Sequence, residues 1–185
     1  TTGVTVFRLK HEIDTGDILL RKSLAILEED NAETIHDKLM AIGAEALVES
    51  LDKIAEGNPI YLPQLNDENL KSAPKIFKET CEIDWFKKVE YIQDFIRGLS
   101  PYPAAWTEIG NGDKQLIIKI YNTTFEPTSN VISGTVSTDN KTFLKIAGSN
   151  GWINIHEIQI AGKKRMKVAD LLRGFSFEVD WKTVR

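Results

Sequence analysis

The stretch KHEIDTGDILLRK, residues 10–22, decides how the first part of the chain folds. It places an Asp-Thr-Gly-Asp turn between two runs, 4–9 and 18–26, in which apolar and polar residues alternate. Alternation at a period of two is typical of β-strands, and Asp and Gly favour the turn between them. The pattern therefore predicts two strands that meet between Asp14 and Gly16.

A long helix is expected after the second strand. Asp30 and Glu33 have the spacing of a capping box, and Gly57 with Pro59 ends the segment. The apolar residues that recur at helical spacing are Ile35, Leu39, Ile42, Leu47, Leu51 and Ile54. Residues 58–78 contain three prolines and no sustained period, which predicts an extended linker after an α/β segment of residues 1–57.

Residues 79–185 have the pattern of a mainly β domain. Asp84 is expected to cap a helix from Trp85 to Arg97, and a brief helix is expected at 168–173. Turn signals such as Asn-Gly and Ser-Asn-Gly separate five predicted strands, at 106–109, 116–125, 134–136, 142–146 and 151–160. Short strands at this spacing predict a small barrel or sandwich.

Composition excludes several classes of protein. Hydrophobic residues make up 42% and charged residues 27% of 185 residues, as in a folded globular chain. The longest apolar runs are far too short for a membrane span. The first residues lack the pattern of a signal peptide, and their abrupt start suggests that the sequence was cut from a longer chain. The single Cys81 and three separated histidines offer neither an internal disulfide nor a zinc motif. The sequence predicts a cytoplasmic protein with no metal site.

Asp14 has more than one interpretation. Asp and Gly are common in turns for local hydrogen-bonding reasons, so the residues alone favour a turn former. Asp-Thr-Gly is also the active-site loop of aspartic proteases, which need paired carboxylates. A second Asp-Thr-Gly is absent, Asp17 would add a charge, and the helix at 31–56 does not suit that all-strand class. The protease interpretation is therefore disfavoured.

A cluster of cations, Gly162-Lys163-Lys164-Arg165 with Lys167, follows the last predicted strand. The net charge of the chain is −4, but residues 101–185 carry 11 Lys and Arg against 8 Asp and Glu. An exposed hairpin loop would explain the cluster, and contact with nucleic-acid phosphates would explain it equally well. Further lysines extend this patch if they lie on the same face: Lys119, Lys141 and Lys145.

Several short motifs, taken in order, resemble those of the methionyl-tRNA formyltransferase family. They are Thr2-Gly3-Val4-Thr5, Ile13-Asp14-Thr15-Gly16-Asp17-Ile18, the capped helix, Ile83-Asp84-Trp85, Ile96 to Trp106, and Ala161 to Met166 before Asp170 to Gly174. Each motif is weak alone, but together and in this order they are specific. Sugar-nucleotide formyltransferases share the Asp-Thr-Gly loop and generally lack the Gly-Lys-Lys block. That family and a non-catalytic RNA-binding module remain the alternatives.

The resemblance implies a fold and a reaction. Residues 1–57 would be the last part of a doubly wound catalytic domain, and residues 79–185 a barrel similar to an oligonucleotide-binding (OB) fold. The implied reaction transfers a formyl group from 10-formyltetrahydrofolate to the methionine of initiator methionyl-tRNA, without a metal. Asp14 matches the catalytic aspartate of the family, whereas the catalytic asparagine and histidine have no counterpart, and His11 does not match the motif. The chain alone is therefore expected to be inactive.

The resemblance also assigns further residues. Glu12, Ile13 and Gly16 would lie beside the folate. The candidates for tRNA contact are Lys75, Lys78, Lys163, Lys164, Arg165 and Lys167. The two tryptophans on predicted strands, Trp106 and Trp152, are expected in the core rather than as base-stacking platforms. The apolar face of the first helix would pack on the rest of its sheet, so exposing that face predicts dimerisation or disorder.

Overall fold

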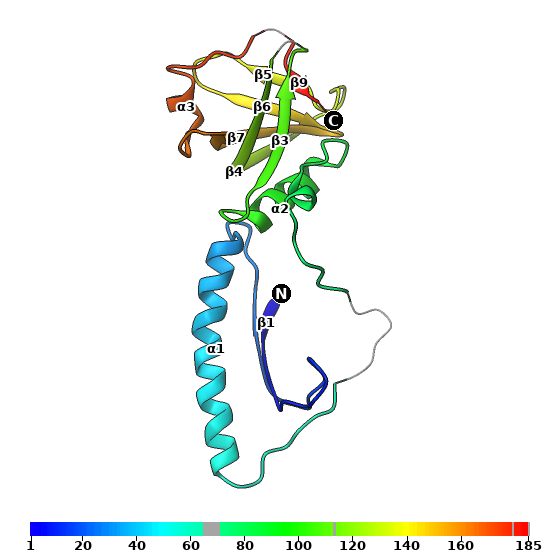
Figure 1. Ribbon diagram of the computed structural model, residues 1–185, viewed down its shortest axis with the longest axis vertical. Coiled ribbons are helices and arrows are strands. Elements are labelled where there is room, and N and C mark those ends of the chain that lie inside the picture. The colour runs from blue at the N-terminus through cyan, green and yellow to red at the C-terminus, as the bar shows by residue number, and fades with distance from the viewer. Residues whose placement is uncertain (65–70, 113, 179, 185) are drawn as a thin grey trace. The chain divides into compact units, whose positions relative to one another are not determined.

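The chain divides into two compact units, Thr1–Pro74 and Lys75–Arg185. The computed structural model describes residues 1–64, 71–112, 114–178 and 180–184 (Figure 1). The change from one unit to the other falls inside the segment predicted as a linker.

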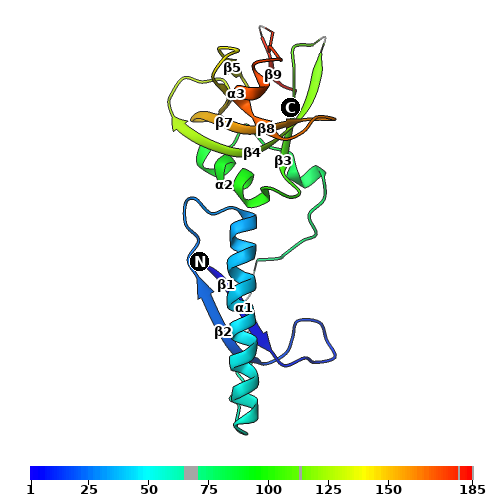
Figure 2. The same cartoon turned by 90° about the vertical axis from the view of Figure 1, so that its left-hand side faces the viewer.

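The first unit is a β-hairpin with a helix along it. Strand β1, Thr2–Phe7, pairs antiparallel with β2, Ile18–Leu24, and the register shifts between Val6 and Phe7. Helix α1, Ala32–Ala55, runs beside both strands, as Figure 2 shows. Alternation at a period of two and then of 3.6 residues correctly predicted these elements.

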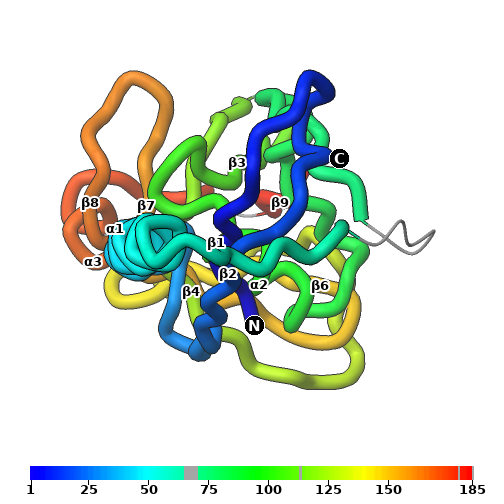
Figure 3. The backbone as a smooth tube through the Cα atoms, turned by 90° about the horizontal axis from the view of Figure 1, so that it is seen from below, coloured from blue at the N-terminus to red at the C-terminus, as the bar shows by residue number. Residues whose placement is uncertain are grey.

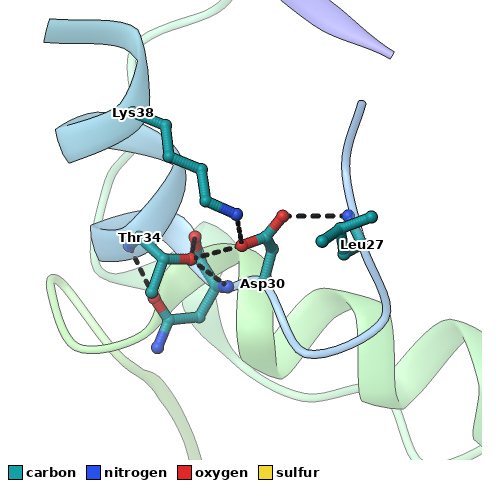
Figure 4. Close-up of polar contacts among 5 residues, drawn as sticks. Leu27, Asp30, Thr34 and Lys38 are labelled. Atoms are coloured by element: carbon teal, nitrogen blue, oxygen red, sulfur yellow. Dashed lines mark hydrogen bonds and ion pairs between the residues drawn. The ribbon is translucent and has the colours of Figure 1, made fainter. Parts of the chain in front are cut away.

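The beginning of α1 differs from the predicted cap. The N-cap is Asn31, whose side chain accepts from the Thr34 N–H at 3.0 Å while the Thr34 hydroxyl accepts from the Asn31 N–H. Asp30 is buried and accepts hydrogen bonds from the Leu27 N–H at 2.9 Å, the Thr34 hydroxyl and the Lys38 ammonium (Figure 4). The predicted capping box that begins at Asp30 is therefore wrong by one residue, and Asp30 instead ties the entering chain to the helix.

Helix α1 has one buried side and one exposed apolar side. Ala46 and Ser50 are buried, and the Ser50 hydroxyl donates to the Ala46 carbonyl at 2.7 Å. Several large apolar side chains of the helix remain exposed: Met40, Leu47, Val48, Leu51 and Ile54. The single predicted stripe is therefore divided, because the two-stranded hairpin covers only one side of the helix.

The second unit is an antiparallel barrel. Its strands are β3, Ala105–Gly110; β4, Gln115–Pro127; β5, Val136–Thr138; β6, Leu144–Gly148; β7, Gly151–Ile160; β8, Met166–Lys167; and β9, Lys182–Thr183. The order across the sheet is β5-β6-β7-β4-β3-β9, with β8 beside β7. The Val136 N–H donates to the Trp181 carbonyl and the Thr183 N–H to the Gly134 carbonyl, so the last strand nearly closes the sheet into a ring. The predicted barrel is confirmed.

Short helices accompany this barrel. They are η1, Glu79–Cys81; α2, Val89–Leu99; and α3, Val168–Leu171. Val89, Ile92 and Ile96 of α2 are buried in the same core as the inward isoleucines of β4 and β7. The predicted start of α2 at Trp85 is wrong, because the Trp85 indole is buried and donates to the Thr107 hydroxyl at 3.0 Å.

The described part of the chain has neither a membrane-spanning helix nor a cluster of metal ligands. Within residues 1–64, 71–112, 114–178 and 180–184, no helix combines the length and the apolar character that a membrane span requires. The same described residues include no group of three or more His, Cys, Asp or Glu side chains placed to hold a metal ion.

Candidate functional site

Asp14 lies in the loop between β1 and β2, drawn in dark blue in Figure 2. The Arg8 N–H donates to the Asp17 carbonyl at 2.9 Å, and the Lys10 ammonium pairs with the Asp17 carboxylate at 3.0 Å, so the loop is closed at its base. Asp14 is exposed and has a φ of 59°, the left-handed conformation that non-glycine residues seldom adopt. The structure therefore presents one carboxylate on a closed loop.

Gly16 fixes how closely the two ends of this loop approach. It is buried, and a Cβ at this position would lie 1.6 Å from the Arg8 carbonyl oxygen. Because no side chain fits that gap, the turn after Asp14 requires glycine.

The other residues predicted beside the folate lie on the exposed part of the loop. Glu12 and Ile13 are exposed, and the Thr15 hydroxyl donates to the Glu12 carbonyl at 3.0 Å. His11 is exposed as well, and the described residues include no hydrogen bond between it and the Asp14 carboxylate. Among the described residues, the Asp14 carboxylate thus has no imidazole as a hydrogen-bond partner.

A contact that sequence reasoning missed connects this loop to the segment after α1. Ile18 and Leu62 exchange two backbone hydrogen bonds, of 2.6 and 2.8 Å. The Gln64 side-chain nitrogen then donates to two carbonyl oxygens of the loop, that of Asp14 at 2.9 Å and that of Gly16 at 2.7 Å. One isolated pair of backbone hydrogen bonds between distant residues produces no periodic pattern in the sequence. Residues 62–64 were therefore predicted only as part of a linker.

The basic cluster forms the loop of a hairpin between β7 and β8, drawn in orange in Figure 3. Gly162 has a φ of 77°, and the Lys163 N–H closes the turn on the Ile160 carbonyl at 2.9 Å. Four cations of this segment are exposed: Lys163, Lys164, Arg165 and Lys167. The structure therefore brings the predicted cluster together at an exposed loop.

These four cations are not equivalent. Arg165 forms an ion pair with Glu157 and its guanidinium lies 4.4 Å from the centroid of the Tyr121 ring. Burial raises the pKa of the Tyr121 hydroxyl, and the charge of Arg165 partly offsets that effect. Lys163 lies 5.7 Å from the Phe175 ring. Arg165 is thus held against the barrel and partly neutralised, whereas the structure gives Lys164 and Lys167 no ion pair with any described residue.

The other candidate lysines lie against aromatic rings. Lys78 is exposed and lies 5.6 Å from the ring of Trp106, whose indole N–H donates to the Lys78 carbonyl at 2.7 Å. Lys75 is also exposed and lies 5.5 Å from the Phe77 ring.

Trp152 differs from its expected core position. It is only partly buried, and the Lys145 ammonium lies 5.0 Å from its ring. Trp106 is likewise only partly buried, although it packs against the core. Alternation along a strand places a side chain on one face of the sheet, but it does not say which face is inside.

Comparison with known families identifies the chain. Residues 75–176 match the family described as "Formyl transferase, C-terminal domain", and residues 1–51 match the family described as "Formyl transferase". The chain belongs to the formyl transferase family. The predicted resemblance is confirmed by curated relatives named methionyl-tRNA formyltransferase.

Two of these relatives show the extent of the match. The formyltransferase of Phocaeicola vulgatus is 49% identical over 181 residues, which cover 94% of this chain and 56% of the relative. That of Parabacteroides distasonis is 46% identical over 180 residues, with 94% and 56% covered. The chain therefore spans a little over half the length of the curated formyltransferases that it matches.

Solved structures share the fold. A methionyl-tRNA formyltransferase from Clostridium thermocellum matches with a TM-score of 0.52 at 22% identity, over 71% of this chain and 54% of that one. HypX from Aquifex aeolicus, solved in complex with tetrahydrofolic acid, matches with a TM-score of 0.65 at 18% identity, over 99% and 34%. WlaRD, a sugar 3N-formyl transferase, matches with a TM-score of 0.58 at 19% identity, over 88% and 56%. At these identities the matches establish the formyltransferase fold and nothing finer.

Proposed function

We propose that this formyltransferase chain is part of an enzyme that transfers a formyl group from 10-formyltetrahydrofolate to the amino group of initiator methionyl-tRNA in the cytoplasm. The observation that carries the proposal is the 49% identity to a methionyl-tRNA formyltransferase over 94% of the chain. Because the chain spans 56% of that relative, the proposal concerns the complete polypeptide.

The chemistry of formyl transfer explains why Asp14 matters in this proposal. The folate supplies the formyl group, and attack by a neutral amine places negative charge on the formyl oxygen and positive charge on the amine nitrogen. The amine then loses a proton, the bond between the formyl carbon and N10 of the folate breaks, and N10 takes up a proton as tetrahydrofolate leaves. Such a reaction needs a hydrogen-bond donor for the oxygen and a route for the departing proton. We assign Asp14 the role of orienting an imidazole that another part of the complete polypeptide supplies. The carboxylate would also favour the protonated form of that imidazole. Without that imidazole the chain alone is expected to be inactive.

The loop would also contribute to folate binding. Glu12 and Ile13 are exposed beside Asp14, and the close approach at Gly16 holds the main chain in place. We assign the backbone from Glu12 to Gly16 to one wall of the pterin site, with no metal taking part.

The test of the catalytic assignment is Asp14→Asn in the complete polypeptide. Asparagine tolerates the left-handed conformation found at this position, so the backbone is retained while the charge is removed. We expect turnover to fall by about 100-fold or more with an unchanged thermal midpoint. Asp37→Asn, at an exposed position on α1, is the control. If the Asp14 variant has wild-type turnover, Asp14 only forms the turn and has no catalytic role.

The basic hairpin is the proposed tRNA contact of the barrel. Lys164 and Lys167 are its principal cations, because Arg165 is paired with Glu157. Lys163 and the exposed lysines Lys75 and Lys78 extend the contact. The plot of log K against log salt has a negative slope, and each phosphate contact that is lost makes this slope less steep by about one.

A titration with tRNA at several salt concentrations tests this contact. The double variant Lys164→Ala with Lys167→Ala is expected to weaken binding and to reduce the salt slope by about two. Lys87→Ala is the control, since Lys87 is exposed and pairs with Asp84 on the same unit. An affinity that does not depend on salt would exclude phosphate contacts.

One alternative within the family is a sugar-nucleotide formyltransferase. The similarity to WlaRD favours it only at the level of fold, at 19% identity. Turnover of the complete enzyme with a sugar nucleotide and not with methionyl-tRNA would support it. If the protein is instead a non-catalytic RNA-binding module, it should bind tRNA and turn over neither substrate.

A further inference from the structure

We infer that Gln64 is a positioning residue for Asp14, an inference that rests on the proposed catalytic role of that aspartate. Gln64 lies fifty residues further along the chain, yet its side-chain nitrogen donates to the Asp14 carbonyl at 2.9 Å. The same nitrogen donates to the Gly16 carbonyl at 2.7 Å. One amide group therefore holds the carbonyl groups of Asp14 and Gly16, the residues on either side of Thr15.

The orientation of the Asp14 carbonyl restrains the direction in which its side chain leaves the backbone. Asp14 has a φ of 59°, in the left-handed region, which Asp and Asn adopt more readily than other non-glycine residues but still seldom occupy. A hydrogen bond to its carbonyl oxygen restrains the second backbone torsion, ψ. With both torsions fixed, the direction of the Cα–Cβ bond is fixed, and the carboxylate starts from a defined position.

Gln64 is itself anchored to the base of the loop. Leu62, two residues earlier, exchanges two backbone hydrogen bonds with Ile18, the first residue of β2. The guanidinium of Arg8, at the other end of the loop, lies 5.9 Å from the centroid of the Tyr61 ring. The segment 61–64 thus lies against both ends of the loop and places the Gln64 amide beside the Asp14 and Gly16 carbonyls.

The chemistry of the side chain suits this role. A neutral amide nitrogen has two N–H groups and can serve two carbonyl oxygens at once. A cation here would favour the charged form of a nearby carboxylate, and an anion would repel both carbonyls and the carboxylate. Glutamine therefore orients the Asp14 backbone without adding a charge beside it.

Gln64→Glu in the complete polypeptide tests the inference, because it keeps the shape of the side chain and removes both donors. We expect kcat to fall by about 10- to 100-fold, because small displacements of a catalytic group have effects of this size. The KM for tRNA and the thermal midpoint are expected to stay unchanged. Gln93→Glu is the matched control, since the Gln93 side chain donates to the Thr123 carbonyl at 2.8 Å in the other unit. Wild-type kcat in Gln64→Glu would overturn the inference.

Gln64→Met separates positioning from charge. Methionine has a similar length, no donor and no charge, and it should reduce kcat as much as glutamate does. A loss confined to the glutamate variant would show that the added charge is responsible, and would overturn the positioning role.

The double variant Asp14→Asn with Gln64→Glu shows whether the glutamine acts through the aspartate. If it does, the double variant has the turnover of Asp14→Asn alone, since residues that act as a unit are not additive. Losses that multiply would contradict the inference while leaving the role of Asp14 intact. Wild-type turnover in Asp14→Asn alone would instead remove the proposed catalytic role, and the inference with it.

Discussion

Gly16 is a position at which the loop has no room for a side chain. A Cβ there would lie 1.6 Å from the Arg8 carbonyl oxygen, which is backbone and cannot move aside as a flexible side chain could. We expect Gly16→Ala to destabilise the folded state by about 1–3 kcal/mol or more and to reduce turnover of the complete enzyme. Thermal unfolding and a turnover assay measure the two effects.

Gly98→Ala is the control for that experiment. Gly98 lies in α2, and beyond the backbone of its own helix a Cβ there would meet nothing within 4 Å. Alanine is the better helix former by about 1 kcal/mol, so this variant should be as stable as the parent or more so. Equal effects at the two glycines would show that the close approach at Gly16 is unimportant.

Asp30 makes a pH-dependent contribution to stability. Its pKa is lowered from 3.8 to about 2, first by the hydrogen bond from Lys38 and then by that from the Leu27 N–H. Because the folded-state pKa lies below the unfolded value, the ionised carboxylate stabilises the fold above pH 3.8, and this stabilisation is lost as the pH falls towards 2. Asp30→Asn should lower the thermal midpoint at pH 7 and differ less from wild type near pH 2. A constant difference across that range would contradict this assignment.

The sequence predicted a local turn where a contiguous motif specified it. Asp-Thr-Gly-Asp predicted a loop between two strands, and that loop forms between β1 and β2, while the catalytic role of Asp14 stays a prediction. Gln64 was not found, because its partners are carbonyl groups that no residue type reveals. The pairing of Arg165 with Glu157 depends on the register of the β7–β8 hairpin, which the pattern did not specify.

At the scale of elements, the exposed side of α1 has a measurable consequence. Met40, Leu47, Leu51 and Ile54 recur at helical spacing and are between 46% and 64% exposed. An apolar surface of this kind associates with another apolar surface in water. We therefore expect the chain on its own to form dimers or larger species, and Leu47→Glu with Leu51→Glu to reduce its mass in sedimentation experiments.

Ala41→Glu is the matched control on the same helix. Ala41 is exposed, and helical spacing places it away from the stripe that Leu47 and Leu51 form. It adds the same charge as either leucine substitution alone, so association should persist. If this variant also fails to associate, the reduced mass of the leucine variant is caused by net charge and not by loss of the apolar stripe.

Element boundaries were predicted less well than element types. Helix α2 begins at Val89 rather than Trp85, because the Trp85 indole bonds to a strand that comes later in the chain. Strand β5 was expected at 134–136 and occupies Val136–Thr138. Strands β8 and β9 have two residues each, which is too short for any periodicity, so they were not predicted.

At the scale of the whole molecule, the two units differ in how complete their cores are. The core cluster of buried residues lies entirely between Cys81 and Trp181, in the second unit. We expect residues 75–185 alone to unfold in one cooperative thermal transition, because a barrel with its own core is stable without further layers. Residues 1–74 alone should show no such transition, since one hairpin and one helix bury little apolar surface. A non-cooperative profile for residues 75–185 would contradict this assignment.

The nearly closed ring of the barrel also bears on how the protein is made. Strand β9 pairs with β3, and the Thr183 N–H bonds to the Gly134 carbonyl, so residues at 182–183 complete the ring. While a ribosome still holds those residues, the nascent barrel exposes unpaired edges at β3 and beside β5, and such edges recruit strands from other chains. Chaperone capture during translation should therefore end when β9 emerges, and a premature stop codon before Lys182 should direct the product to inclusion bodies.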